Sequence, residues 1–81
     1  MNKKIEILFF GKLKDTWNTN MLNIVTNCDD IESLYTELLS KTTQVPHKES
    51  IKVAINDEFV EWKADIKDGD CIAFLPPASG G

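Results

Sequence analysis

The chain's 81 residues, 42% of them hydrophobic and 27% charged, indicate one globular domain rather than a disordered chain. A net charge of −4, with nine lysines and no arginine, argues against nucleic acid as a partner, because phosphate recognition needs clustered cations. The apolar run near the start, Ile7 to Phe10, is too short for a signal peptide or a membrane span, so we expect a cytoplasmic protein with no membrane partner.

The first third of the chain predicts two paired strands. Residues 4–10 alternate between two faces, as a half-buried strand does. The expected core face is Ile5, Ile7 and Phe9, and the opposite face is Glu6, Leu8 and Phe10. Residues 11–19 are a polar connection that contains Trp17, and residues 21–28 predict a second strand with Leu22 and Ile24 inward. The two strands are expected to form a hairpin with a long loop.

A helix is predicted after this hairpin. Asp29 or Asp30 is the candidate N-cap, since a carboxylate there accepts an exposed backbone N–H. Apolar residues recur behind it at spacings of three and four, namely Ile31, Leu34, Tyr35, Leu38 and Leu39. This stripe predicts a helix of about three turns whose apolar face packs on the core.

The second half of the chain predicts three more strands. Ile51, Val53 and Ile55 are the inward positions of the first. After a turn at residues 56–58, Phe59 to Trp62 is a short extended piece with Val60 inward and Phe59 exposed. The turn at Asp68-Gly69 begins the last strand, with Ile72 and Phe74 on one face and Cys71, Ala73 and Leu75 on the other. This pattern predicts an α+β fold with one main helix packed on one face of a mixed sheet.

The chain ends on an unusual arm. Pro76 and Pro77 lack backbone N–H donors and stop the last strand. The five residues from Pro77 onward can reach roughly 17 Å, at about 3.3 to 3.6 Å each. Gly80 and Gly81 have no Cβ, so they can thread a narrow channel in which a partner acts on the terminal carboxylate. We therefore predict a folded domain over residues 1–76 and a flexible, extended tail over residues 77–81.

One helix can cover only one face of a sheet, and apolar residues remain on the other. These are Leu8, Phe10, Ala73 and Leu75, with Phe59 nearby. Two phenylalanines and two leucines can form a patch larger than the few hundred Å² that monomers usually expose. Together with Pro76 and Pro77 they are the candidate partner interface, unless they are scattered surface residues that need no partner.

Residues with catalytic or metal-binding chemistry are few. Cys28 and Cys71 are expected to be reduced in the cytoplasm and to behave as small hydrophobic residues, since neither belongs to a Cys-x-x-Cys motif. His47 stands in a polar loop and is expected to be solvated. The sequence contains no Ser-His-Asp set, P-loop or metal cluster. We expect no bound metal or cofactor.

Four stretches resemble, in order, the small subunit of molybdopterin synthase, a sulfur carrier in the MoaD and ThiS family of ubiquitin-like proteins. They are Ile7 to Lys14, Val53 to Val60, Asp68 to Asp70 and Ala73 to Gly81. The resemblance spans nearly the whole chain, although Thr16 to Asp29 and Thr42 to Ser50 match loosely. It implies the β-grasp fold of ubiquitin.

The resemblance also implies a chemistry for the terminus. An activating enzyme that uses ATP would adenylate Gly81, sulfur transfer would convert it to a thiocarboxylate, and that sulfur would enter the dithiolene of molybdopterin during molybdenum cofactor biosynthesis. The large synthase subunit is the second implied partner, in a two-plus-two heterotetramer, and this chain would have no activity alone. The family often has arginine where Lys14 stands, so a bidentate contact at Lys14 is not implied.

Two alternatives remain open. The sulfur carrier of thiamin thiazole synthesis also ends in Gly-Gly, although the lead-in Phe74 to Ser79 resembles the molybdopterin type. A ubiquitin-like protein modifier or binding module would instead join Gly81 to a lysine through an isopeptide bond.

Overall fold

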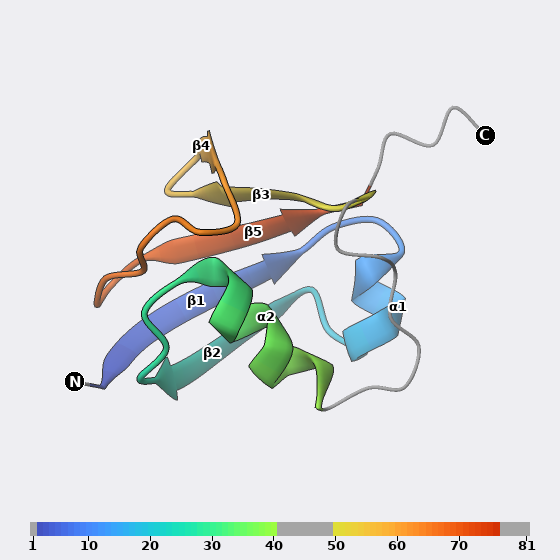
Figure 1. The fold of residues 1–81 in the computed structure, drawn as a ribbon. Helices are drawn as coiled ribbons and strands as arrows, with labels where there is room; N and C mark the ends of the chain where they lie inside the picture. The colour runs from blue at the N-terminus through green and yellow to red at the C-terminus, as the bar shows by residue number, and fades with distance from the viewer. Residues whose placement is uncertain (1, 41–49, 77–81) are drawn as a thin grey trace.

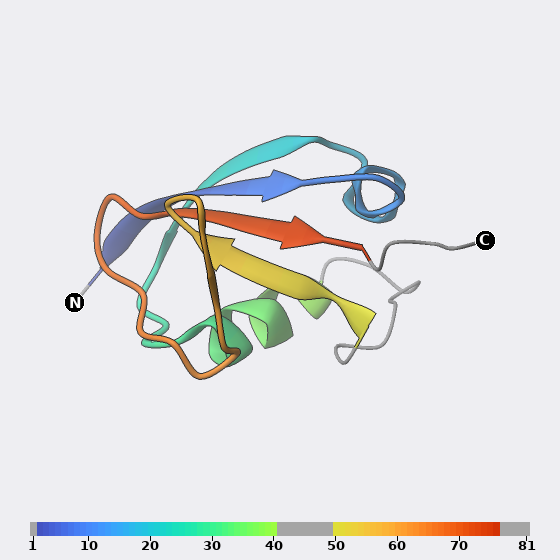
Figure 2. The ribbon, with the colours of Figure 1, turned by 90° about the horizontal axis from the view of Figure 1, so that it is seen from above.

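The computed structural model describes residues 2–40 and 50–76. Its elements follow one another as β1 (Lys3–Phe9), α1 (Leu13–Trp17), β2 (Met21–Thr26), α2 (Ile31–Leu39), β3 (Lys52–Ile55), β4 (Glu58–Val60) and β5 (Cys71–Leu75). The strands form one sheet in the order β2-β1-β5-β3-β4, in which β1 and β5 are parallel and the other neighbours antiparallel. Helix α2 lies on one side of this sheet (Figures 1 and 2). The predicted α+β arrangement, a mixed sheet with one main helix, is confirmed.

The core lies between the sheet and α2, on the faces that alternation predicts. Its strand residues include Ile5, Ile7, Phe9, Val53, Ile72 and Phe74, all at most 3% exposed. Leu22 and Ile24 are half-buried and pack against this core, as predicted. An aromatic cluster of Phe9, Trp17, Tyr35, Trp62 and Phe74 runs through it.

Helix α2 begins at the predicted cap. Asp30 has extended backbone geometry, and its carboxylate accepts the Ser33 amide at 2.8 Å. The same hydrogen bond holds the pKa of Asp30 below its ordinary value. The predicted apolar stripe faces the sheet, where Ile31, Leu34, Tyr35 and Leu38 are buried and Leu39 half-buried.

The prediction for residues 11–19 was wrong. A short helix, α1, occupies Leu13–Trp17 where we expected a polar connection. Leu13 and Trp17 lie four positions apart, and a helix places both on one face. Leu13 is 1% exposed and Trp17 stacks on Phe9 with ring centroids 4.7 Å apart. Asn18 ends the helix in the left-handed conformation, with φ 57°.

Three strands end earlier than predicted, and one of them, β4, starts at Glu58 within the predicted turn and ends at Val60 rather than Trp62. β1 ends at Phe9 rather than Phe10, and β2 ends at Thr26 rather than Cys28. The predictions for His47, Pro77, Gly80 and Gly81, and the boundary at residue 77, concern positions outside the described residues. In residues 2–40 and 50–76 no helix is long and apolar enough to cross a membrane.

Candidate functional site

The face of the sheet opposite α2 carries a row of apolar side chains across all five strands. The strand registers place Leu8 opposite Met21 and Ala73, and Ala54 opposite Ala73 and Phe59. Strands are about 4.8 Å apart, so this outer row spans roughly 19 Å. We call the five residues Met21, Leu8, Ala73, Ala54 and Phe59 the outer row. The described residues place no helix over it (Figure 2).

The exposure of the outer row is greatest at its ends. Phe59 is 70% exposed and Met21 47%, whereas Leu8 and Ala73 are half-buried. Ala54 is only 7% exposed although its register puts it on the outer face, between Ala73 and Phe59. The row therefore offers two projecting side chains joined by a flat apolar strip.

Phe10, Leu75 and Pro76 border the row where β1 and β5 end. Phe10 is 44% exposed, and its amide donates to the carbonyl of Phe74 at 3.2 Å, which holds it beside the end of β5. Leu75 and Pro76 are half-buried. Lys52 lies opposite Leu75 on β3, so a positively charged side chain stands next to these apolar residues. The structure thus places Leu8, Phe10 and Leu75 together, and Phe59 at the far end of the row.

Gly11 shapes the point where the chain leaves the sheet. Its φ of +56° is a conformation that side chains disfavour, and an added Cβ would lie 2.7 Å from Cγ of Pro76. The Pro76 ring therefore rests directly against the backbone after β1. This contact holds the root of the carboxyl-terminal segment at the border of the apolar face.

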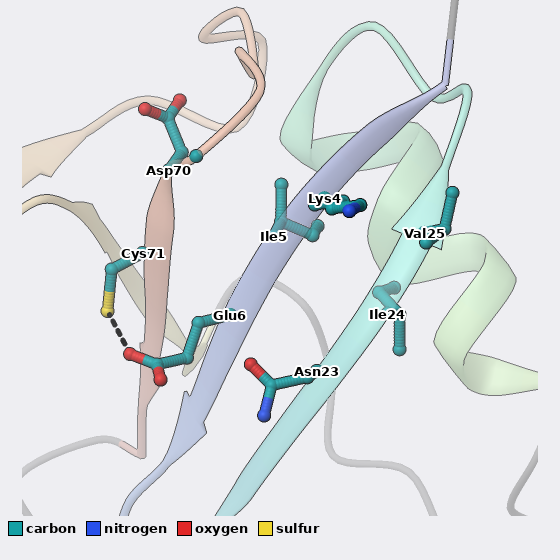
Figure 3. A pocket seen from close by; sticks show the side chains of 9 residues that line it. Lys4, Ile5, Glu6, Asn23, Ile24, Val25, Asp70 and Cys71 are labelled. Carbon is teal, nitrogen blue, oxygen red and sulfur yellow. Dashed lines mark hydrogen bonds between the residues drawn. The ribbon is translucent and has the colours of Figure 1, made fainter.

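The thiols do not form a reactive centre. Cys71 lies on the outer face of β5 and donates to Oε1 of Glu6 at 3.4 Å, in an open pocket lined by β1, β2 and the start of β5 (Figure 3). Burial raises the pKa of the Cys71 thiol, and the hydrogen bond and charge of Glu6 add to this. Cys28 is half-buried, and its thiol lies 3.7 Å from Oε1 of Glu37. No set of three metal-ligating side chains is brought together within residues 2–40 and 50–76.

Two members of the outer row were not among the predicted interface residues. Met21 and Ala54 belong to it only because of the register between neighbouring strands. Alternation along residues 21–28 already put Met21 outward, but nothing local to β2 says that it faces Leu8. Lys14, the other residue singled out from the sequence, is exposed on α1.

The chain is similar to known proteins in both sequence and fold. Residues 7–81 match the ThiS family. The molybdopterin synthase sulfur carrier subunit of Drosophila yakuba is 30% identical, over 95% of this chain and 90% of that protein. In a solved complex of subunits 1 and 2 of molybdopterin-converting factor from Helicobacter pylori 26695, the matching chain is 29% identical, with a TM-score of 0.66 and 100% of both chains covered.

The fold has matches at lower sequence identity as well. Small archaeal modifier protein 1 from Methanosarcina acetivorans gives a TM-score of 0.80 at 20% identity, over 100% of this chain and 99% of that chain. A mixed five-stranded sheet on one main helix, shared with these structures, defines a ubiquitin-like β-grasp domain. The chain belongs to the ThiS family, which its sequence matches from residue 7 to residue 81. The resemblance found in the sequence is confirmed.

Proposed function

We propose that this chain is the sulfur-carrier small subunit of a molybdopterin synthase, acting in molybdenum cofactor biosynthesis. The observation that carries the proposal is the apolar outer row with Pro76 at its border, in a chain whose sequence continues from Pro76 to a Gly-Gly terminus. Family membership and the names of the similar proteins support it. A cytoplasmic location follows from the same proposal.

The proposed chemistry takes place on Gly81 and uses partner enzymes. The terminal carboxylate attacks the α-phosphate of ATP, pyrophosphate leaves, and an acyl adenylate forms in the activating enzyme. Hydrosulfide (HS⁻) then attacks the carbonyl carbon, AMP leaves and the remaining S–H proton is lost, which gives the thiocarboxylate. Gly80 allows the tail to enter each active site, since it has no side chain to block the channel. This chain supplies the carboxylate and the docking surface.

The proposed docking surface is the outer row together with Phe10, Leu75, Pro76 and Pro77. A partner that covers the outer row receives the tail in a fixed direction, because Gly11 and Pro76 hold the tail root beside it. The partners are the large synthase subunit, in a two-plus-two assembly, and the activating enzyme. Exposed aromatic residues such as Phe59 are the expected energetic anchors.

Deletion of Gly81 tests the carrier role. The full chain, incubated with the activating enzyme, ATP and a sulfur source, is expected to gain the mass of replacing one oxygen by sulfur, located in its last two residues. The chain without Gly81 should fold with the same circular dichroism spectrum and gain no sulfur. If the shortened chain accepts sulfur as fast as the full one, the role proposed for Gly81 is wrong.

Substitution of Phe59 by aspartate tests the docking surface. Phe59 is 70% exposed, so its loss should leave folding intact while removing an anchor and placing a charge in the interface. We expect the affinity for the large subunit, measured by calorimetry, to fall about tenfold or more. Thr36→Asp on the exposed side of α2 is the matched control and should bind normally. Equal affinities for both variants would refute the docking surface.

A protein modifier is the rival that the same terminus permits. Activated Gly81 would then be attacked by a lysine amine, with AMP leaving and an isopeptide bond forming. A ladder of covalent adducts on a denaturing gel, in place of the thiocarboxylate, would identify that function.

A further inference from the structure

β2 is one edge of the sheet. It pairs with β1, and the described residues place no strand on its other side (Figure 1). The Phe9 amide donates to the carbonyl of Asn20 at 3.1 Å, which fixes the alternation of hydrogen-bonded pairs along this antiparallel ladder. The residues whose backbone groups point toward β1 are therefore Leu22, Ile24 and Thr26. Those whose groups point outward are Met21, Asn23 and Val25.

Thr19 closes one end of this edge. Its hydroxyl donates to the Met21 carbonyl at 2.8 Å and accepts from the Met21 amide at 3.3 Å. Asn23 and Val25 have no comparable partner in the described structure, so their N–H and C=O groups face solvent. Figure 3 shows Asn23, Ile24 and Val25 consecutively on this strand. We call residues 23–25 the open window.

The two edges of the sheet differ in how they resist pairing. β4 has three residues and begins with Glu58. β2 has six residues, of which none is charged and none is proline. Short length, charge and proline are the usual means by which natural sheets prevent edge-to-edge association. Val25 in the window is also 59% exposed and apolar. β2 is therefore the edge that is able to accept another strand.

We infer that the open window pairs with the same window of a second copy of this chain. In a two-fold antiparallel pairing with Ile24 opposite Ile24, Asn23 of each copy lies opposite Val25 of the other. Both members of each such pair exchange N–H and C=O bonds, so every outward group of the window gains a partner. Met21, which Thr19 has already satisfied, is not needed. This self-complementarity favours a second copy over an unrelated strand.

Charge and geometry set the character of this dimer. The window is uncharged while each chain carries −4, so the copies repel at long range and association strengthens as salt screens that repulsion. Two short windows bury little area, which makes the dimer weak and reversible. The two-fold axis makes the β5 strands of the copies antiparallel, so their carboxyl ends point in opposite directions. The inference does not depend on the proposed function.

Sedimentation equilibrium over about a hundredfold range of concentration tests the dimer. The native chain is expected to pass from monomer to dimer, with tighter association at higher salt. Val25→Glu should weaken dimerisation at least about tenfold, because it places two carboxylates about 7 to 8 Å apart across the pairing. Met21→Glu is the matched control, since it adds the same charge to the same strand outside the window. At the same high salt concentration, the Met21→Glu chain should dimerise more tightly than the Val25→Glu chain.

Amide hydrogen exchange locates the contact. In the monomer, the amide hydrogens of Leu22 and Ile24 should be protected from exchange. Those of Asn23 and Val25 should exchange rapidly. Raising the concentration should protect Asn23 and Val25, and Val25→Pro, which removes an outward donor, should prevent this. A chain that stays monomeric throughout, or equal weakening by the two glutamate variants, would overturn the proposal. Protection of Asn23 and Val25 only after addition of the large subunit would likewise overturn it and assign the window to a heterologous strand.

Discussion

At the scale of single residues, Cys71 shows how this chain keeps a thiol inert. Its sulfur donates to Glu6 at 3.4 Å, and burial, this hydrogen bond and the carboxylates of Glu6 and Asp57 together raise the pKa of the thiol. The thiolate is the nucleophilic form of cysteine. Under the proposed function this would protect the acyl adenylate at Gly81, because a protonated thiol is a poor nucleophile.

We predict that Glu6→Gln makes Cys71 more reactive. The neutral amide removes the negative charge beside the sulfur, so the pKa should fall and iodoacetamide should alkylate Cys71 faster at a fixed pH near 8. The site of modification is read by peptide mass, with Cys28 as the internal reference. An unchanged ratio of Cys71 to Cys28 alkylation would show that Glu6 does not control the thiol.

The same raised pKa predicts how stability depends on pH. The ordinary value is 9.0, and the folded chain holds the Cys71 proton to higher pH than the unfolded chain does. Cys71 therefore stabilises the fold most fully below pH 9, and this contribution is lost as pH rises through the folded-state pKa. Urea midpoints measured between pH 7 and 10.5 should fall more for the native chain than for Cys71→Ser.

At the scale of secondary-structure elements, α1 joins the end of β1 to the end of α2. Trp17 stacks on Phe9, and its indole N–H donates to the carbonyl of Leu38 at 3.0 Å. That carbonyl lies in the last turn of α2, where backbone acceptors lack helical donors. One side chain thus satisfies a helix terminus and covers one side of the core.

We predict separate energetic contributions for the two parts of Trp17. Trp17→Phe keeps a ring on Phe9 but removes the indole hydrogen bond to the Leu38 carbonyl, and should cost about 0.5–1.5 kcal/mol of unfolding free energy. Trp17→Ala also loses the packing and should cost about 2–4 kcal/mol, since the side chain is half-buried. Chemical denaturation followed by circular dichroism measures both. Equal losses would assign the whole effect to the hydrogen bond.

The elements also show what local sequence determines. Inward positions such as Ile5, Val53 and Phe74 followed from period-two alternation, and the start of α2 followed from Asp30. The helix α1 could not be predicted in this way, because only two apolar residues, four positions apart, distinguish its sequence from that of a polar loop. The outer row could be predicted only in part, since Met21 and Ala54 join it through pairings across long connections. Periodicity fixes the face of a side chain but not its neighbour on the next strand.

At the scale of the whole molecule, the proposed docking surface and the proposed reactive group lie in different parts of the chain. The outer row belongs to the sheet, where registers and core packing hold it in place. The proposed reactive group is the carboxylate of Gly81, which lies beyond Pro76 in sequence. If the two functions are separable, a chain without Gly81 retains the surface that the large subunit recognises and lacks the group that donates sulfur.

Such a shortened chain should therefore inhibit molybdopterin synthesis by competition. Added to a reaction containing the large subunit and thiocarboxylated full chain, it should occupy the large subunit's binding site for this chain, and excess thiocarboxylated full chain should restore the rate. Combining the deletion with Phe59→Asp should abolish inhibition, because the anchor that is 70% exposed is lost. The deletion combined with Thr36→Asp should still inhibit. Inhibition that survives Phe59→Asp would place recognition in the tail rather than in the sheet.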